Sequence, residues 1–330
     1  MKENDIRPEN LMADNLSCIE EDRAFLLARK DRWVGVPCPA CGADDAAPYG
    51  EKDGFGYVLC AACGTVYTSP RPDVRTLHAM YAQSKNYAYW NKHIFPASDA
   101  ARKERIYAPR AVMLLEHARA CGLEGGTFLE VGAGFGSFCE VVRETGFFGR
   151  VLAVEPVHEL AETCRGKGLE TLSMPVEHVE GTGFADVVAS FEVIEHLFDP
   201  SVFLHKAHSL LRAGGMLVLS CPNYKGFDMQ VMGLASKSFD HEHVNYFHPV
   251  SLARLLHRTG FDVRTVFTPG RLDASIVRDA VEQGEADVSG SPLLEYVFGD
   301  GWEQTGDDFQ AFISRYGMSS HMVAVATRRG

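Results

Sequence analysis

Short apolar runs alternate with amphipathic segments along the chain from about residue 127 onward. The apolar runs have strand length, and the segments near 156–167, 199–212 and 248–260 carry apolar residues at helical spacing. The runs read TFLEV, RVLAVE, LETLS, DVVASF, GMLVLSC, FDVRTVF and HMVAVAT. This alternation predicts an α/β domain with a parallel sheet between two layers of helices. HMVAVAT follows an insertion, 269–317, and we expect it to be the one antiparallel strand.

The chain before residue 127 has a different pattern. Residues 1–35 are charged and weakly helical, which predicts a loose arm or a helix packed on the rest. Residues 36–72 are rich in Cys, Gly and Pro, with short β-like pieces, YVLC and TVYTS. Residues 73–122 contain helical patterns, interrupted at Pro109. We therefore expect an arm, a small domain, a helical linker or lid, and a large domain over 123–330.

Four of the nine cysteines form two C-x-x-C pairs, CPAC at 38–41 and CAAC at 60–63, separated by eighteen residues. Zinc prefers four thiolates in a tetrahedron, and each pair supplies two from one tight turn. Gly42 and Gly64 follow the pairs, where the turn needs a positive φ. The pattern predicts a structural zinc ribbon with the ligands Cys38, Cys41, Cys60 and Cys63. A redox dithiol or coincidence is the alternative.

Composition narrows the classes of function. The apolar fraction is 46% and the net charge is −12, which argues against a broad nucleic-acid-binding surface. The first residues, MKENDIRPEN, lack the apolar run of a signal peptide, and no run approaches the ~18 apolar residues of a membrane span. We expect a cytoplasmic protein that binds neither membrane nor nucleic acid. The oligomeric state stays open.

FLEVGAGFGSF, Phe128 to Phe138, links an apolar run to a helical pattern, and a second apolar run ends at Glu155. A strand, glycine turn, helix and strand of this kind can hold a nucleoside cofactor, with the second acid accepting hydrogen bonds from ribose. Glu130 precedes the first glycine by two residues, where an acid would repel a pyrophosphate but attract an amine. This favours S-adenosylmethionine (SAM). An ordinary glycine-rich turn is the alternative.

Two further segments carry candidate chemistry. Phe191, Glu192, Glu195 and His196 follow a predicted strand, at the edge where open α/β sheets bind ligands. His196 could instead bond backbone at a helix start. FDHEHVNYFHP, 239–249, places two histidines beside a glutamate, which favours a general base over a metal site. A polar loop with helix-capping histidines is the alternative here.

These pieces, in this order, resemble class I SAM-dependent methyltransferases. EVGAGFG, VEP, FEVIEHL and LLRAGG match the motifs of that family over about 125–265. The resemblance implies a seven-stranded Rossmann-like sheet preceded by a small zinc ribbon. It also implies a SAM site comprising Glu130, Gly132, Gly134, Gly136, Glu155, Phe191 and Glu192. Glu155 would bind the ribose, and Glu130 with the glycine loop would bind the amino-acid end. SMPVEH lacks the family Asp that contacts adenine.

A narrower resemblance is to the zinc-binding sugar C-methyltransferases of deoxysugar biosynthesis. It implies that His243 is the base, with Glu242 as its partner, and that His196 positions the substrate. YAYW resembles the substrate-facing aromatic segment of that family. The residues assigned to the acceptor are Tyr87, Tyr89, Asn223 and Tyr246. Asp240 replaces a family tyrosine, and the large C-terminal domain of that family is missing.

The expected activity is therefore methyl transfer from SAM to a small molecule, with a sugar or nucleotide sugar favoured and C- and O-methylation both open. A zinc-ribbon methyltransferase acting on RNA or protein is one alternative. Residues 36–70 argue against it, because Lys52 is their only basic residue, against Glu51 and three aspartates. A non-catalytic SAM-binding protein is the other alternative.

Overall fold

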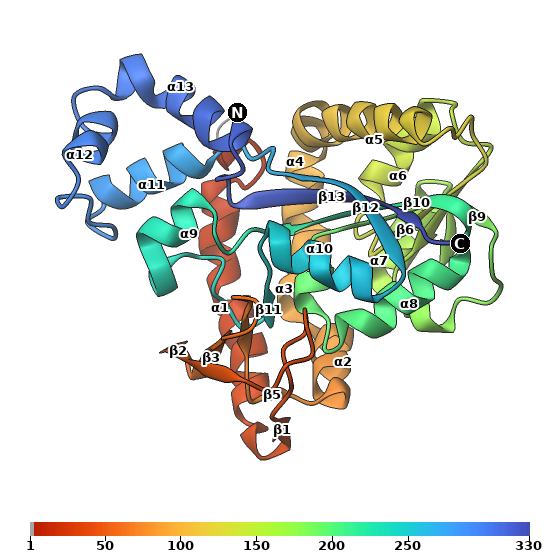
Figure 1. The fold of residues 1–330 in the computed structure, drawn as a ribbon, viewed down its shortest axis with the longest axis horizontal. Coiled ribbons are helices and arrows are strands. Elements are labelled where there is room, and N and C mark those ends of the chain that lie inside the picture. The colour runs from red at the N-terminus through yellow and green to blue at the C-terminus, as the bar shows by residue number, and fades with distance from the viewer. Residues whose placement is uncertain (1–2) are drawn as a thin grey trace.

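A seven-stranded sheet forms the centre of the computed structural model, which describes residues 3–330 (Figure 1). Its strands are β6 (Thr127–Val131), β7 (Arg150–Val154), β8 (Glu170–Leu172), β9 (Ala185–Phe191), β10 (Leu211–Pro222), β12 (Phe261–Phe267) and β13 (His321–Arg328). Their order is β12-β13-β10-β9-β6-β7-β8. β13 pairs antiparallel with both neighbours, whereas β6 to β10 pair parallel. The predicted sheet, with its single antiparallel strand, is confirmed.

Helices cover both faces of this sheet. The covering helices are α5 (Ala108–Ala120), α6 (Ser137–Glu144), α7 (His158–Gly166), α8 (Pro200–Leu210) and α10 (Pro249–Arg258). Successive residues of β6 point to opposite sides. Phe128 packs with α5, α6 and α7, whereas Leu129 packs with α8 and α10. Burial on both faces explains why these strands read as nearly continuous apolar runs.

The cysteine-rich segment forms a second, four-stranded sheet in the order β11-β4-β3-β2. Its strands are β2 (Ala46–Lys52), β3 (Phe55–Cys60), β4 (Val66–Thr68) and β11 (Asn245–Tyr246). A separate short ladder joins β1 (Trp33–Val34) to β5 (Arg71–Pro72). β11 comes from the segment that contains His243, far along the chain. The ribbon sheet and the predicted catalytic loop are therefore joined by strand pairing.

The N-terminal segment forms a helix, α1 (Glu9–Leu27), which packs on α2 (Val74–Gln83) and α3 (Lys85–Tyr89). α3 continues through a π-helical turn, Trp90–Ile94, into α4 (Phe95–Arg102), and a second π-helical turn, Lys103–Tyr107, leads into α5. Figure 1 shows α1 beside α2 and α3. Of the two expectations for residues 1–35, the packed helix is therefore the one observed.

The insertion before β13 forms a helical lobe beyond the end of the sheet (Figure 1). It comprises α11 (Asp273–Glu282), α12 (Pro292–Phe298) and α13 (Trp302–Arg315), and α11 packs on α9 (Phe227–Met232). The lobe has its own small apolar cluster around Val277, Val297 and Phe298. Short 3₁₀ turns complete the fold at Glu3–Asp5, Lys30–Arg32, Val176–His178, Ile194–His196 and Gly233–Ala235. Within residues 3–330, no helix is long and apolar enough to cross a membrane.

Candidate active site

A cavity of about 430 Å³ opens at the carboxyl ends of β6, β7 and β9. The sheet order reverses between β6 and β9, which is where open α/β sheets bind their ligands. Gly132 and Gly134 line it from the loop after β6, Glu155 from the end of β7, and Glu192 from the end of β9. Four of the predicted cofactor residues therefore share one cavity.

Glu155 braces the glycine loop from below. One carboxylate oxygen accepts from the Gly134 N–H at 2.8 Å and the other from the Val157 N–H at 2.9 Å. The residue is 4% exposed, and burial raises its pKa although both hydrogen bonds oppose the rise. Because Glu155 both shapes the loop and lines the cavity, it can hold a polar ligand in a fixed position at the edge of the sheet.

The loop conformation depends on glycine at two of these positions. Gly132 and Gly134 have φ values of 75° and 53°, which side-chain-bearing residues rarely adopt. A Cβ on Gly132 would also lie 2.5 Å from a methyl carbon of Val193. The glycines thus allow the backbone to turn tightly at the cavity wall, as a SAM-binding loop requires.

Three predicted cofactor residues do not line the cavity. Glu130 is buried behind the loop, where its Oε2 accepts from Cys139 Sγ at 2.9 Å, and burial raises its pKa to about 7. Phe191 packs edge-to-face on Phe138, with ring centroids 4.9 Å apart. Gly136 lies at the start of α6. Their roles toward SAM stay predictions, and the structure places all three in support of the cavity wall.

Tyr81, Tyr87 and His196 form the opposite wall of the same cavity. The rings of Tyr81 and Tyr87 meet edge-to-face at 5.7 Å, and Tyr81 faces His196 at 6.2 Å. The Tyr81 hydroxyl is buried without a hydrogen-bond partner among the described residues. Nothing in the sequence indicates a role for Tyr81, because its helical segment carries no motif.

His196 is a neutral acceptor at this wall. Its Nδ1 lies 3.2 Å from the main-chain carbonyl of Glu242, so Nδ1 carries the hydrogen and Nε2 keeps a lone pair. Burial and the neighbouring His243 lower the pKa of His196 to about 3. Glu195 lies behind it, with its Oε1 3.9 Å from Nε2 and both carboxylate oxygens without a partner among the described residues. Burial and Glu192 raise the pKa of Glu195 well above its usual value.

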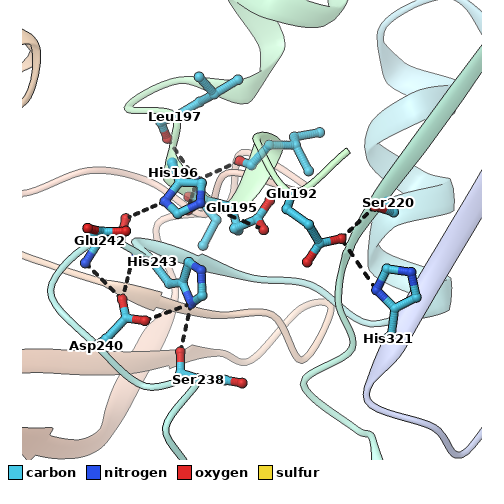
Figure 2. A network of polar contacts seen from close by, with 12 residues as sticks. Glu192, Glu195, His196, Leu197, Ser220, Ser238, Asp240, Glu242, His243 and His321 are labelled. Atoms are coloured by element: carbon cyan, nitrogen blue, oxygen red, sulfur yellow. Dashed lines mark hydrogen bonds and ion pairs between the residues drawn. The ribbon is translucent and has the colours of Figure 1, made fainter. Parts of the chain in front are cut away.

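His243 packs against His196 with ring centroids 4.7 Å apart and ring planes tilted by 50° (Figure 2). His243 does not itself line the cavity. Its Nδ1 lies 2.8 Å from the Ser238 carbonyl, which leaves Nε2 unprotonated in the neutral ring. Asp240 Oδ2 lies 3.3 Å from the same Nδ1. Burial opposes a charge on the ring, but Asp240 and the Ser238 carbonyl raise the pKa of His243 above its usual value.

The carboxylate that contacts His243 is therefore that of Asp240, which corrects the predicted pairing with Glu242. Glu242 Oε1 instead accepts from Asn86 Nδ2 at 2.7 Å and lies 3.7 Å from His241 Nε2. Adjacent residues on a loop point in different directions, so the carboxylate next in sequence to His243 is turned toward α3. Asp240 also accepts from the N–H groups of Glu242 and His243 at 2.8 Å.

Glu192 marks a second polar group at the end of β9. It has a φ of 55°, which is rare outside glycine and typical of constrained functional positions. Its Oε1 accepts from Ser220 Oγ and lies 3.3 Å from His321 Nδ1 (Figure 2). One ligand atom each of Glu195, His196 and His243 lie within 4.8 Å of one another, a spacing that would also suit a divalent cation.

Arg71 and Asn245 join the two loops that carry His196 and His243. Arg71 is fully buried and donates to the carbonyls of Thr68, Phe198 and Val244 and to Asn245 Oδ1. Asn245 Nδ2 in turn donates to the carbonyls of Ile194, Glu195 and Leu197. Neither residue could be predicted from the sequence, because a buried arginine bonded only to carbonyls and an amide leaves no pattern there.

Only one of the four predicted acceptor residues, Tyr87, lines the cavity. Tyr89 packs on His93, with ring centroids 4.6 Å apart. Asn223 is fully buried and donates to the Ser319 carbonyl at 2.9 Å. Tyr246 is 1% exposed and stacks on Phe239 at 4.5 Å. Hydrogen bonds with the main chain hold Asn223, and aromatic packing holds Tyr246, so neither faces the cavity.

The four predicted zinc ligands converge. Their sulfur atoms lie within 4.8 Å of one another, and the pairs Cys38–Cys63 and Cys41–Cys60 are 3.5 Å and 3.6 Å apart. A tetrahedron with Zn–S bonds of about 2.3 Å has edges of about 3.8 Å, so the four thiolates fit zinc. All four ligands come from the protein, so a zinc ion here would be structural.

Three comparisons bear on the family. The methyltransferase-domain family model matches residues 102–266. The ubiquinone biosynthesis O-methyltransferase of Xanthomonas oryzae pv. oryzae (strain PXO99A) is 32% identical over 179 residues, which cover 51% of this chain and 66% of that protein. The chain thus spans just under two thirds of that relative.

The enzyme of the same description from Xylella fastidiosa (strain M23) is 26% identical over 195 residues, covering 54% of this chain and 75% of that protein. Among solved structures, the complex between the Haloferax volcanii Trm112 methyltransferase activator and a methyltransferase contains a similar chain. It has a TM-score of 0.50 and 16% identity, and the match covers 74% of this chain and 98% of that one. At this identity, the likeness supports the fold alone.

Proposed function

This chain belongs to the SAM-dependent methyltransferase family, and on that premise we propose that it methylates a small molecule, with a sugar or nucleotide sugar as the favoured acceptor. SAM would supply a methyl group activated by its positive sulfonium. Gly132, Gly134 and Glu155 would hold the polar parts of SAM. The apolar side chains of Leu160 and Val176 would contact its adenine ring. Tyr81 and Tyr87, on the opposite wall, would exclude water from the acceptor.

The observation that carries the proposal is the contact between His196, which lines the cavity, and His243, 4.7 Å behind it. In the proposal the acceptor extends past His196 so that His243 can remove its proton through Nε2, because the Nδ1 hydrogen of His243 is committed to Ser238. Asp240 stabilises the resulting imidazolium. The neutral His196 positions the acceptor by accepting a hydrogen bond. Glu242 completes the polar rim of this group.

Two observations support a small acceptor over a macromolecule. The relatives named as ubiquinone biosynthesis O-methyltransferases act in the synthesis of a small molecule, by that description. The ribbon has little positive charge with which to attract RNA phosphates. The same base would serve either a hydroxyl or a carbon next to a carbonyl, so C- and O-methylation are both compatible with the proposal.

The test is a transfer assay with methyl-labelled SAM and four classes of acceptor: nucleotide keto sugars, other nucleotide sugars, catechols, and bulk RNA or protein. We expect the label in a sugar, and NMR of the product distinguishes a C-methyl from an O-methyl group. Label confined to catechols would contradict the sugar acceptor and assign catechols as the substrate class. Label confined to RNA or protein would overturn the proposal of a small-molecule acceptor. His243→Ala is the matched control and should bind SAM yet transfer no methyl group.

A further inference from the structure

The N-terminal helix α1 reaches the catalytic loop through a chain of two side-chain amides. Asn15 Nδ2, on α1, donates to Asn86 Oδ1 at 2.7 Å, and Asn86 Nδ2 donates to Glu242 Oε1 at 2.7 Å. Asn15 is fully buried, and the Glu242 side chain is 12% exposed. Three segments that are distant in sequence therefore share one continuous hydrogen-bonded path.

The direction of this path is fixed by its acceptors. Glu242 offers only carboxylate oxygens, so the Asn86 amide must present its NH₂ group to Glu242 and its oxygen to Asn15. Asp22, also on α1, holds the Asn86 backbone in place. Its carboxylate accepts from the N–H groups of Lys85 at 2.9 Å and Asn86 at 3.1 Å. α1 thus sets both the backbone position and the amide orientation of Asn86.

A polar path of this kind is costly to bury unless its groups are satisfied, and apolar side chains would join two helices at less cost. The path ends at the carboxylate of Glu242, which directly precedes the predicted base His243 in the sequence. We propose that Asn86 is a positioning residue that orients Glu242, and that α1 is thereby a functional part of the acceptor site. The inference rests on the proposed function, which includes Glu242 in the polar group around the base His243.

The proposal has a measurable electrostatic consequence. Burial raises the pKa of Glu242, while His241 and the Asn86 hydrogen bond lower it. Loss of the Asn86 donor should therefore let Glu242 take a proton at higher pH. His241 Nε2 lies 3.7 Å from the same carboxylate, so its ring signals should report that protonation.

The experiment is an NMR pH titration of histidine-labelled protein saturated with S-adenosylhomocysteine. Glu242→Gln identifies the step in the His241 signals that belongs to Glu242. We expect Asn86→Leu to move this step upward by roughly one pH unit, and Asn15→Leu to move it in the same direction by less. Asn91 lies in the π-helical turn after α3, and its amide oxygen accepts from Thr163. Asn91→Leu should therefore leave the step unchanged.

An unmoved step in Asn86→Leu, an equal shift in Asn91→Leu, or the lack of any Glu242-dependent step in the wild type would each overturn the proposal. Asn15→Leu carries the test alone if Asn86→Leu does not fold. The titration needs no acceptor and no turnover. Its outcome is therefore separate from that of the transfer assay, which can fail while the titration still supports the role of Asn86.

Discussion

At the scale of single residues, main-chain carbonyls determine the tautomers of the histidines at the cavity wall. His196 and His243 each lose one ring nitrogen to a carbonyl, from Glu242 and Ser238, and each keeps Nε2 free. The two rings then differ in pKa, because burial and His243 lower the pKa of His196, whereas Asp240 and the Ser238 carbonyl outweigh burial and raise the pKa of His243. In the proposal, the same residue type thus serves as a neutral hydrogen-bond acceptor at one position and as a base at the other.

This difference predicts the pH dependence of turnover. A base acts when unprotonated, so activity should rise as pH increases through the pKa of His243. Asp240 raises that pKa, and Asp240→Asn should therefore move the rising limb to lower pH. Asn keeps an oxygen for the N–H groups that Asp240 caps, so the loop should persist. A limb that stays in place or moves to higher pH would assign the base elsewhere.

Glu155 gives a second prediction at this scale. Glu155→Ala removes both hydrogen bonds to the loop and its cavity-facing carboxylate, so SAM affinity should fall roughly 10- to 100-fold. Calorimetry measures this directly. Glu159→Ala is a matched control on the exposed surface of α7 and should bind SAM as the wild type does. Equal affinity in both variants would refute the assigned cofactor site.

At the scale of elements, α9 carries a buried carboxylate against the insertion. Asp228 is 6% exposed and its Oδ1 has no partner among the described residues. Burial and Asp273, on α11, raise its pKa to about 7. The sequence showed no reason for this, because the α9–α11 contact exists only in the folded chain.

Asp228 should make stability depend on pH. Its folded pKa lies above its unfolded value, so the folded state binds the proton more tightly and stability falls as pH rises toward 7. Asp228→Asn removes this titrating group. The free energy of unfolding of the variant, relative to that of the wild type, should therefore increase by ~1–3 kcal/mol from pH 5 to pH 8. Urea unfolding at both pH values measures the gain. Asp300→Asn, on the exposed surface, should show none.

Across the full chain, the four-stranded ribbon sheet includes a strand from the segment that carries His243. β11 pairs with β4, and buried Arg71 bonds the loops on both sides of the junction. The division into separate ribbon and methyltransferase domains stays a prediction. The shared strand means that disorder in the ribbon should reach the loop that carries His243.

Zinc removal tests that coupling. Purified protein should contain about one zinc per chain, and Cys60→Ser should lose it together with solubility. Chelation should lower the thermal midpoint in a single transition, because the two parts share a sheet. It should also abolish methyl transfer while SAM binding persists, since no ribbon residue lines the cavity. Two separate transitions, or full activity without zinc, would contradict the coupling.

The sheet, the glycine loop and the cysteine cluster could be predicted from the sequence alone. These depend on local rules: period-2 and helical spacing, glycine at positive φ, and ligand pairs two residues apart. Neighbours in sequence supply most of that information, so Gly132, Gly134, Glu155 and the four cysteines could be placed without coordinates.

Which side chains meet at the cavity could be known only from the folded chain. The direction of a side chain on an irregular loop depends on partners that are distant in sequence. Glu242 therefore faces Asn86, Asp240 contacts His243, and Tyr246 serves packing. Arg71 and Asn15 act only through contacts with residues distant in sequence, so no local sequence pattern predicts their roles.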